Sequence, residues 1–210
     1  MACELLVHLA RRRPITWKDD IRAAVGSFMR QNVNSALVPT MNRMLLRPIA
    51  DHDDAQVRTL VRSCLSRAGL AIPGTAYFDP QLPHLTAYYA GLDHARYWVV
   101  EVEGHVVAGA GIAPVPGIAG TCELQKLYVD AAYRGRGYAT ALMDQAIAYA
   151  SQWYQWCYLE THTKLAVARS MYVRRGFKPL PRPLTAGEHQ AMDHWAIKDL
   201  SGNRDYPSQG

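Results

Sequence analysis

The sequence predicts a mixed α/β domain, and three observations lead to that prediction. From Met44 onward, short apolar runs typical of strands alternate with segments typical of helices. The 210 residues are 49% hydrophobic and 20% charged, which is ordinary for one globular domain with a sizeable core. A glycine-rich turn also joins one apolar run to a helix-like segment. We therefore expect one domain over residues 44–200, between an N-terminal helical extension (1–43) and a C-terminal tail (201–210).

The expected elements follow in order along this domain. Strands are expected at 45–48, 97–102, 106–113, 123–129, 156–160 and 195–200, with a hairpin turn at 103–105. Helices are expected at 51–68, 84–89, 165–174 and from the glycine-rich turn to about 153. Asp51 and Asp54 suit a helix start, because acidic residues stabilise the free amides there. A loop is expected at 69–83, and a proline-broken connection at 179–183.

The first 43 residues carry two helical patterns, at about 4–12 and 17–31. They could form an appendage that packs on the domain or mediates a homodimer. They could equally be dispensable and result from an upstream start codon, because Met41 and Met44 immediately precede the first expected strand. Both interpretations remain open at this point.

The glycine-rich turn at 134–137 is a candidate anion site. The first amides of a helix have no carbonyl partner within the helix, and the peptide dipoles place partial positive charge there. Gly135 and Gly137 remove side chains that would keep a pyrophosphate away from those amides, and Arg134 and Arg136 add charge. The alternative is an ordinary turn with surface arginines, because short glycine motifs are weak signals.

Two familiar phosphate-binding motifs do not explain this turn. The sequence contains no G-x-x-x-x-G-K-[ST] motif, which argues against a P-loop. Gly109-Ala110-Gly111 begins like a dinucleotide fingerprint, but Pro114 stands where the third glycine would be. We therefore expect that segment to be a strand with small residues.

The sequence RGRGYA at 134–139 matches the [RQ]-x-x-G-x-[GA] signature of the GNAT superfamily of N-acetyltransferases, which this sequence resembles. A second element, YVRRGF at 172–177, resembles the Y-x-x-x-G-F of that superfamily. GTAYFDP, GAGIAP and CELQKLYV are similar to a branch of small bacterial-type GNAT proteins. The resemblance covers about 44–200. It implies the GNAT fold, a twisted and mostly antiparallel sheet flanked by helices, with acetyl-coenzyme A as co-substrate.

The resemblance also implies which residues hold the coenzyme. In the superfamily, the pantetheine arm pairs with the strand before the glycine-rich turn, and the resemblance gives that role to Leu127 and Val129. The Leu127 amide would then donate to the thioester carbonyl and stabilise the oxyanion. The implied cofactor-binding residues are Leu127, Tyr128, Val129, Arg134, Gly135, Arg136, Gly137, Tyr138, Ala139 and Thr140.

Glu123 is the candidate general base. Strand alternation predicts Glu123, Gln125, Leu127 and Val129 on one face and Cys122, Leu124, Lys126 and Tyr128 on the other. An alkylammonium has a pKa of about 10, so an amine acceptor must lose a proton before or during attack. Glu123 would accept it, directly or through water, and burial would raise the pKa of Glu123. Alternatively, Glu123 orients solvent or binds a cationic substrate.

Tyr172 is the candidate proton donor to the departing thiolate, by its place in the Y-x-x-x-G-F motif. The alternative is a core tyrosine. The sequence departs from the family at Leu165, where many GNAT proteins have asparagine seven residues before this tyrosine. The contact made by that amide must be absent, or replaced by Thr161 or Thr163.

The acceptor pocket is the least specified part of the predicted site. Residues 74–79, Tyr88, Tyr89 and His162 could line it. We expect no metal, because His162 lacks a second ligand at metal spacing and the four cysteines form no C-x-x-C pair. The acceptor is expected to be a small-molecule or peptide amine.

The net charge of +5 suits an anionic ligand, whereas the basic run at 11–13 is short and without aromatics. No apolar stretch reaches about eighteen residues, so a cytoplasmic protein without a membrane segment is expected. The predicted activity is acetyl transfer to a primary amine by direct attack in a ternary complex. The alternatives are a coenzyme-binding module without turnover, and a basic nucleic-acid-associated protein using residues 11–13.

Overall fold

The computed structural model describes residues 44–185, 189–201 and 206. These residues belong to a compact unit, Asn42–Gly210. The predicted helical extension at 1–43 lies outside the described residues, as does most of the predicted tail at 201–210. Both assignments therefore stay predictions.

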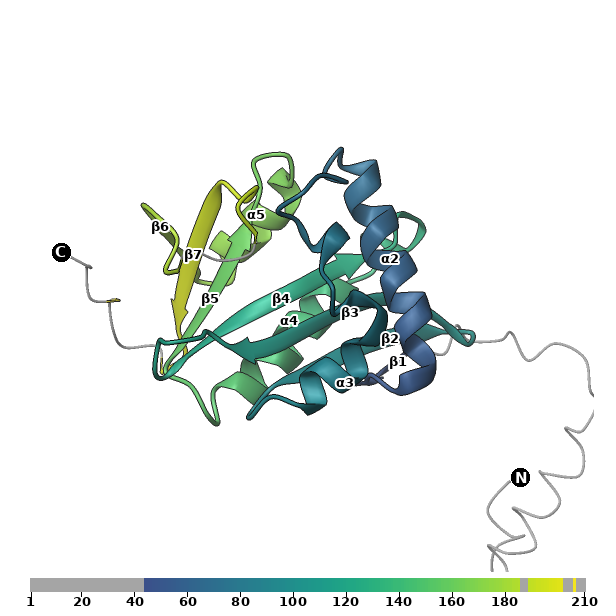
Figure 1. The fold of residues 1–210 in the computed structure, drawn as a ribbon, viewed down its shortest axis with the longest axis horizontal. Helices are drawn as coiled ribbons and strands as arrows, with labels where there is room; N and C mark the ends of the chain where they lie inside the picture. Colours follow the sequence, from purple (N-terminus) through teal and green to yellow (C-terminus); the bar gives the residue numbers. More distant parts are fainter. Residues whose placement is uncertain (1–43, 186–188, 202–205, 207–210) are drawn as a thin grey trace, which may run out of the picture. The chain divides into compact units, whose positions relative to one another are not determined.

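The described chain forms one seven-stranded sheet in the order β1-β2-β3-β4-β5-β7-β6 (Figure 1). Its strands are β1 (Met44–Pro48), β2 (Arg96–Val102), β3 (His105–Pro114), β4 (Thr121–Val129), β5 (Trp156–Thr161), β6 (Lys178–Leu180) and β7 (His194–Asp199). Neighbouring strands are antiparallel except β4 and β5, which are parallel. The predicted mixed, mostly antiparallel sheet is thus confirmed.

Helices cover both faces of the sheet (Figure 1). The α-helices are α2 (Asp54–Arg67), α3 (Leu85–Ala90), α4 (Tyr138–Ala150) and α5 (Ala166–Arg174), and the short 3-10 helices are η1 (Asp51–Asp53), η2 (Ala76–Phe78), η3 (Leu82–His84) and η4 (Ala131–Tyr133). Side chains of β2 alternate between two cores: Trp98 and Val100 pack in the α4-side core, whereas Tyr97 and Val99 pack with α2 and α3. A strand whose two faces are both buried has a nearly continuous apolar sequence, and β2 has such a sequence.

Two predicted boundaries on the C-terminal side were wrong. The helix expected to reach about 153 ends at Ala150, where the hydroxyl of Ser151 bonds to the Ile147 carbonyl at 2.8 Å. The connection predicted at 179–183 begins inside β6, in which Pro179 is paired with Ala196 of β7. Proline has no amide hydrogen to donate, but it is tolerated on an edge strand, and β6 is an edge of this sheet.

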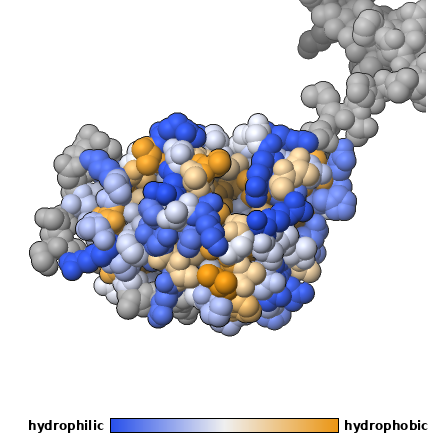
Figure 2. Space-filling model, turned by 90° about the horizontal axis from the view of Figure 1, so that it is seen from above, coloured by the Kyte–Doolittle hydropathy of each residue, from blue (hydrophilic) through white to orange (hydrophobic). Residues whose placement is uncertain are grey.

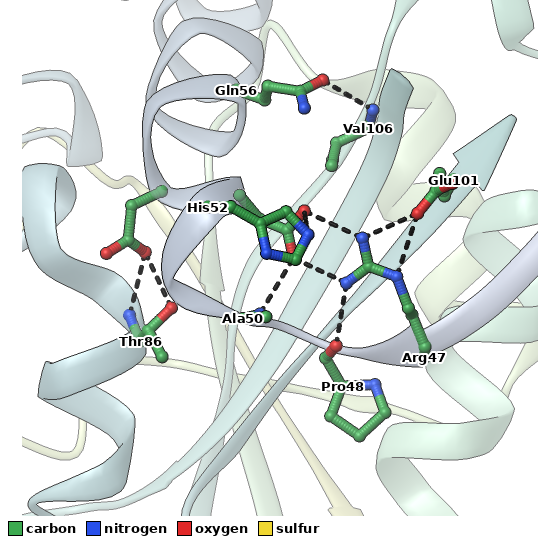
Figure 3. Close-up of polar contacts among 10 residues, drawn as sticks. Arg47, Pro48, Ala50, His52, Gln56, Thr86, Glu101 and Val106 are labelled. Atoms are coloured by element: carbon green, nitrogen blue, oxygen red, sulfur yellow. Dashed lines mark hydrogen bonds and ion pairs between the residues drawn. The ribbon is translucent and has the colours of Figure 1, made fainter. Parts of the chain in front are cut away.

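An ion pair with a buried carboxylate joins the first strand to the start of α2 (Figure 3). The guanidinium of Arg47 reaches both oxygens of Asp53, at 2.6 and 2.9 Å, and bonds to Glu101 on β2 at 2.7 Å. Asp53 is fully buried and also accepts the Ala50 amide at 2.9 Å. The arginine holds the pKa of Asp53 below its usual range, although burial alone would raise it. These contacts fix the chain direction between the sheet and the helix.

Some large apolar side chains remain exposed, including Met44 and Leu45 on the edge strand β1 and Val167 and Val173 on α5. Seen from above in Figure 2, apolar groups on this side of the described chain lie among hydrophilic ones. The predicted homodimer is therefore still without an assigned surface and stays a prediction.

Candidate active site

Strands β4 and β5 pair at one end only. Their registered pairs are Thr121 with Trp156, Cys122 with Cys157 and Glu123 with Tyr158. Beyond these pairs β4 continues to Val129 and β5 to Thr161, and the two strands diverge in Figure 1. We call this region, residues 124–129 and 159–161, the β4–β5 fork. Strand edges that face a fork can pair with an extended ligand.

A β-bulge in β4 overturns the predicted alternation of its side chains. Gly109 of β3 pairs with Tyr128 and Gly111 with Gln125, so two residues of β4 lie opposite one residue of β3. The extra residue is accommodated at Lys126, whose φ is +50°.

The bulge changes which β4 side chains share a face. Leu127 and Val129 therefore pack in the α4-side core together with Cys122 and Leu124. Tyr128 packs in the core beneath α2 and α3, where Gln125 contacts Tyr89, and Lys126 reaches Asp79. Leu127 and Glu123 thus lie on opposite faces, so the predicted shared face was wrong; the sequence pattern contained no signal for the bulge.

The glycine-rich turn places open space beside the N-terminus of α4. Gly135 and Gly137 have φ of +75° and +84°, a left-handed conformation that side chains disfavour. A Cβ at either position would meet no described atom within 4 Å. The helix N-cap has no side-chain hydrogen bond within the described chain, and the Ala141 amide bonds to the Gly137 carbonyl at 3.0 Å. The amides of residues 138–140 precede that bond, so they could donate to an anion such as a pyrophosphate.

The two arginines of the turn are exposed, and hydrogen bonds to backbone carbonyls orient their side chains. Arg134 Nε donates to the Val129 carbonyl at 3.2 Å. Arg136 donates to the Ala132 carbonyl at 3.3 Å, and its guanidinium lies 4.8 Å from the centre of the Tyr133 ring. Positive charge is thereby held next to the α4 N-terminus, where it would attract an anion.

Glu123 lies in an oriented hydrogen-bond chain. Gln125 Nε2 donates to Glu123 Oε2 at 2.8 Å, and the Tyr89 hydroxyl donates to Gln125 Oε1 at 3.0 Å. Burial raises the pKa of Glu123, and the Gln125 hydrogen bond opposes that rise. A carboxylate with a raised pKa is a better proton acceptor near neutral pH.

Two further groups join Glu123 in a cluster that sequence reasoning missed. Acidic oxygens of Glu123 and Glu160 and a ring nitrogen of His189 all lie within 4.8 Å of one another. Glu160 accepts a 2.7 Å hydrogen bond from the Tyr158 hydroxyl, and burial raises the pKa of Glu160. We call Glu123, Glu160 and His189 the carboxylate–histidine cluster. It joins β4, β5 and the segment before β7, and so no local sequence motif could have indicated it.

A buried ion pair supports this cluster. Lys126 Nζ lies 2.6 Å from Asp79 Oδ2, and His189 Nε2 lies 3.0 Å from Asp79 Oδ1. The two partners lower the pKa of Asp79 against the effect of burial. Asp79 also outweighs burial at His189, so the pKa of His189 is raised above 6.5. Lys126 is available for this pair because the bulge turns it toward Asp79.

Tyr172 lies in the α4-side core. Its side chain is 9% exposed and meets Phe177 edge to face, with ring centres 5.9 Å apart. Burial raises the pKa of Tyr172, so its hydroxyl keeps its proton at neutral pH. Glu123 lies on the other face of the sheet, where it is hydrogen-bonded to Gln125 and, through Gln125, linked to Tyr89. The two candidate catalytic groups therefore approach the sheet from opposite faces.

The position that departs from the family pattern is the N-cap of α5. Leu165 makes no side-chain cap there and packs against the α2-side core. The hydroxyl of Thr161 is buried and has no hydrogen-bond partner in the described chain. Thr163 is exposed, and its hydroxyl lies 3.4 Å from His194 Nδ1. Of the two predicted substitutes for the amide, Thr161 is the one with an unused polar group.

The predicted acceptor-pocket residues separate into two groups. Tyr89 contacts Gln125 and Asp79 contacts Lys126, both on the same strand as Glu123. Tyr88 packs against Tyr89 with ring centres 5.1 Å apart. His162 instead lies 3.9 Å from Asp193 and accepts a hydrogen bond from the Lys164 amide. The first group borders the carboxylate–histidine cluster, whereas His162 belongs to a separate network.

Comparisons with known proteins show the class to which this fold and site belong. The sequence model of the acetyltransferase (GNAT) family matches residues 62–177. The uncharacterized N-acetyltransferase YjgM of Escherichia coli (strain K12) is 38% identical over 165 residues, covering 77% of this chain and 95% of that protein. The chain therefore belongs to the GNAT family of acetyltransferases, as the resemblance indicated.

Solved structures have the same fold. A GNAT-family acetyltransferase from Staphylococcus aureus Mu50 superposes with a TM-score of 0.68 at 18% identity, over 75% of this chain and 99% of that one. The PaiA N-acetyltransferase from Thermoplasma acidophilum, solved in complex with coenzyme A, gives a TM-score of 0.57 at 17% identity, over 75% and 99%. Among the residues that the structure describes, no helix has the length and apolar character needed to cross a membrane.

Proposed function

We propose that this acetyltransferase transfers an acetyl group from acetyl-coenzyme A to a primary amine by direct attack in a ternary complex. The observation that carries the proposal is the place of the Glu123 carboxylate, which accepts a 2.8 Å hydrogen bond from Gln125 at the last pair before the β4–β5 fork; burial there raises its pKa. The glycine turn that follows the same strand offers free amides to a pyrophosphate. A coenzyme held at the turn and along the fork would lie beside Glu123. We also expect a cytoplasmic location, where acetyl-coenzyme A is available.

The residues that would hold the coenzyme fit its parts. Gly135 and Gly137 leave room for the pyrophosphate beside the amides of residues 138–140, with Arg134 and Arg136 as counter-charges. The β4 edge at Leu127 to Val129 would pair with the extended arm, because β5 leaves that edge unpaired. When bound, acetyl-coenzyme A supplies an activated acyl group as a thioester.

Three groups of this chain would then act on the reacting atoms. Glu123 accepts a proton from the amine; because Gln125 donates to Oε2, we assign that proton to Oε1. The Leu127 amide, next to the bulge, donates to the carbonyl oxygen as negative charge develops on it. Tyr172 supplies a proton to the departing thiolate, and its raised pKa keeps that proton in place beforehand.

The acceptor itself would be a small-molecule or peptide amine. Two carboxylates whose pKa values are raised by burial, those of Glu123 and Glu160, face the place where it would lose its proton. A cationic ammonium favours the ionised form of both, which would help it to bind.

One observation favours a second candidate function, a coenzyme-binding module without turnover. Leu165 stands at the α5 N-cap without the side-chain contact that an asparagine could make there. Such a module would bind the coenzyme at the turn but would release no thiol.

The test combines binding with turnover. Isothermal calorimetry measures association with acetyl-coenzyme A, and a thiol assay follows release of coenzyme A with a panel of monoamines, diamines and peptides. We expect binding, thiol release with at least one amine, and a loss of about a hundredfold in kcat for Glu123→Gln. Binding without thiol release from any amine would favour the module, and no binding by folded protein would refute both.

A further inference from the structure

We infer that His189 is a second proton-transfer residue of the acceptor site, which passes the proton received by Glu123 on to solvent. Asp79 and Lys126 hold its ring in position. The inference rests on the proposed function and adds to it the route by which the acceptor's proton leaves. The geometry that carries it is the carboxylate–histidine cluster together with the ion pair behind it.

Distance and exposure place His189 between the base and solvent. A ring nitrogen of His189 lies within 4.8 Å of acidic oxygens of both Glu123 and Glu160, a span that one water molecule can bridge. The His189 side chain is 19% exposed. Glu123 is more enclosed: Gln125 occupies one of its oxygens, and burial raises its pKa. A proton on Glu123 therefore has a titratable neighbour that reaches solvent.

The ion pair fixes which ring nitrogen exchanges protons. His189 Nε2 lies 3.0 and 3.2 Å from the two oxygens of Asp79. An ionised carboxylate has no proton to donate, so Nε2 must carry the hydrogen of this contact. Lys126 keeps Asp79 ionised from 2.6 Å, and its side chain is only 2% exposed. Nε2 is thus the protonated nitrogen in both states of the ring, and Nδ1 is left to gain and lose the proton.

The charges around His189 suit a group that changes its protonation during turnover. Asp79 and Glu123 favour the imidazolium, whereas burial and Lys126 oppose it, and the pKa of His189 is raised overall. Glu160 faces it from β5 within the same cluster. An ammonium group that enters beside Glu123 adds positive charge and so favours release of the proton from His189. Binding of the acceptor would therefore prepare Nδ1 to receive the next proton.

The proton balance requires such a route. An ammonium acceptor carries one proton more than the free amine, and that proton passes from its nitrogen to Glu123, then to the His189 ring, then to solvent. The free amine forms the new carbon–nitrogen bond as the carbon–sulfur bond breaks. The nitrogen loses its second N–H proton to Glu123 as well, and that proton leaves by the same route, while Tyr172 gives a proton to the thiolate and regains one from solvent. The net release is one proton per turnover, because two leave the nitrogen and Tyr172 takes up one.

The first test is independent of turnover. Histidine Cε1–H signals of the full chain are followed by NMR as a function of pH, and the signal of His189, one of eight histidines, is assigned by its absence in His189→Gln. We expect a pKa above 6.5 for His189 in the wild type. It should fall in Asp79→Asn, because the opposite charge is removed. Equal His189 pKa values in the two proteins would overturn the inference.

The second test separates proton transfer from a structural role. His189→Ala should lower kcat with the best amine of the panel about tenfold or more, and added imidazole should restore it by entering the space left by the ring. His189→Gln can still donate to Asp79 but cannot titrate, so its kcat should be low at every pH and coenzyme affinity should stay within about twofold. The matched control is His105→Ala, which removes an exposed histidine at the start of β3 and should leave kcat unchanged.

The outcomes distinguish the inference from the proposed function. If wild-type protein acetylates no amine of the panel, the proposed function fails. If the wild type is active and His189→Ala keeps full kcat, or loses kcat that imidazole does not restore, the inference alone fails. Loss of kcat with recovery in imidazole, together with the shift in the NMR titration, supports it.

Discussion

Gly137 combines two demands in one residue. Its φ of +84° is a conformation that a side chain disfavours, and the space beside it is open where the pyrophosphate would lie. Sequence reasoning anticipated the need for space. The positive φ is a separate reason for glycine, because it lets the chain turn from η4 into α4 and expose the first amides of the helix.

A side chain at this position should therefore weaken coenzyme binding directly. For Gly137→Val we expect a Kd for coenzyme A at least about tenfold higher, together with a loss of about 1–2 kcal/mol in the free energy of unfolding from backbone strain. Calorimetry and urea unfolding measure the two effects. Gly104→Val is the control for strain alone, since Gly104 has a φ of +81° in the β2–β3 turn. Equal coenzyme affinity in wild type and Gly137→Val would exclude the turn as the pyrophosphate site.

Tyr172 should affect turnover and not binding. Tyr172→Phe keeps the ring that packs on Phe177 and removes only the hydroxyl. We expect kcat to fall about tenfold to a hundredfold, with coenzyme affinity within about twofold. Steady-state thiol release and calorimetry provide the comparison. A variant that loses affinity and kcat in equal measure would assign Tyr172 to the core and to binding.

Thr161 offers a second residue for the coenzyme. Its hydroxyl is buried without a hydrogen-bond partner in the described chain, which is costly unless a ligand satisfies it. Thr161→Val should therefore raise the Kd for coenzyme A severalfold, by about 1 kcal/mol, while leaving the free protein as stable or more so. Thr163→Val is the matched control on the exposed neighbour. A Thr161→Val protein with wild-type affinity and lower stability would show that the hydroxyl is satisfied within the protein.

At the scale of elements, the ion pair between β1 and the start of α2 links two elements, and breaking it should be costly. Arg47→Met leaves the buried carboxylate of Asp53 without its arginine, although the Ala50 amide still donates to it, so the free energy of unfolding should fall by about 3 kcal/mol at pH 7. The control is Arg58→Met, which removes an exposed arginine of α2. Urea unfolding of both variants at several pH values makes the comparison.

The sign of the pH dependence follows from Asp53. Its folded pKa is lowered, so its contribution is present above the unfolded value of 3.8 and is lost as pH falls through the folded value. In Arg47→Met, burial acts without the arginine, and protonation of Asp53 then relieves the penalty. The stability gap between wild type and Arg47→Met should therefore begin to narrow above pH 3.8, as pH falls through the raised pKa of Asp53 in the variant, and should continue to narrow until the lowered pKa of the wild type is passed. A stability gap that stays constant with pH would mean that Arg47 does not change the pKa of Asp53 in the folded protein.

How far the sequence predicts each element depends on how local its signal is. Strands such as β2 and β3 are long apolar runs joined by a short turn, and both were predicted within a residue. Strand β6 has three residues and a central proline, so its pairing with β7 depends on the rest of the sheet. The bulge in β4 places Lys126, a residue without glycine's freedom, at positive φ. Only its pairing with β3 reveals that conformation.

The same distinction holds for the candidate site. The coenzyme turn is contiguous in sequence, and its residues could be chosen from a motif. The acceptor side is assembled from distant segments: Asp79 follows η2, Glu123 and Lys126 lie on β4, and His189 precedes β7. Sequence reasoning found Glu123 and included Asp79 in a broad range, but nothing along the chain connects either one with His189.

At the scale of the whole molecule, the sheet consists of two parts, β1–β4 and β5–β7, that are joined by three residue pairs. An extended co-substrate bound between them would pair with the free edge of β4 and so connect the two parts beyond the three residue pairs. A ligand of this kind that binds only the native state would raise resistance to heat and proteases by an amount that grows with the logarithm of its concentration. Cells short of acetyl groups would then hold a looser, shorter-lived form of this protein, and its abundance would follow their metabolic state.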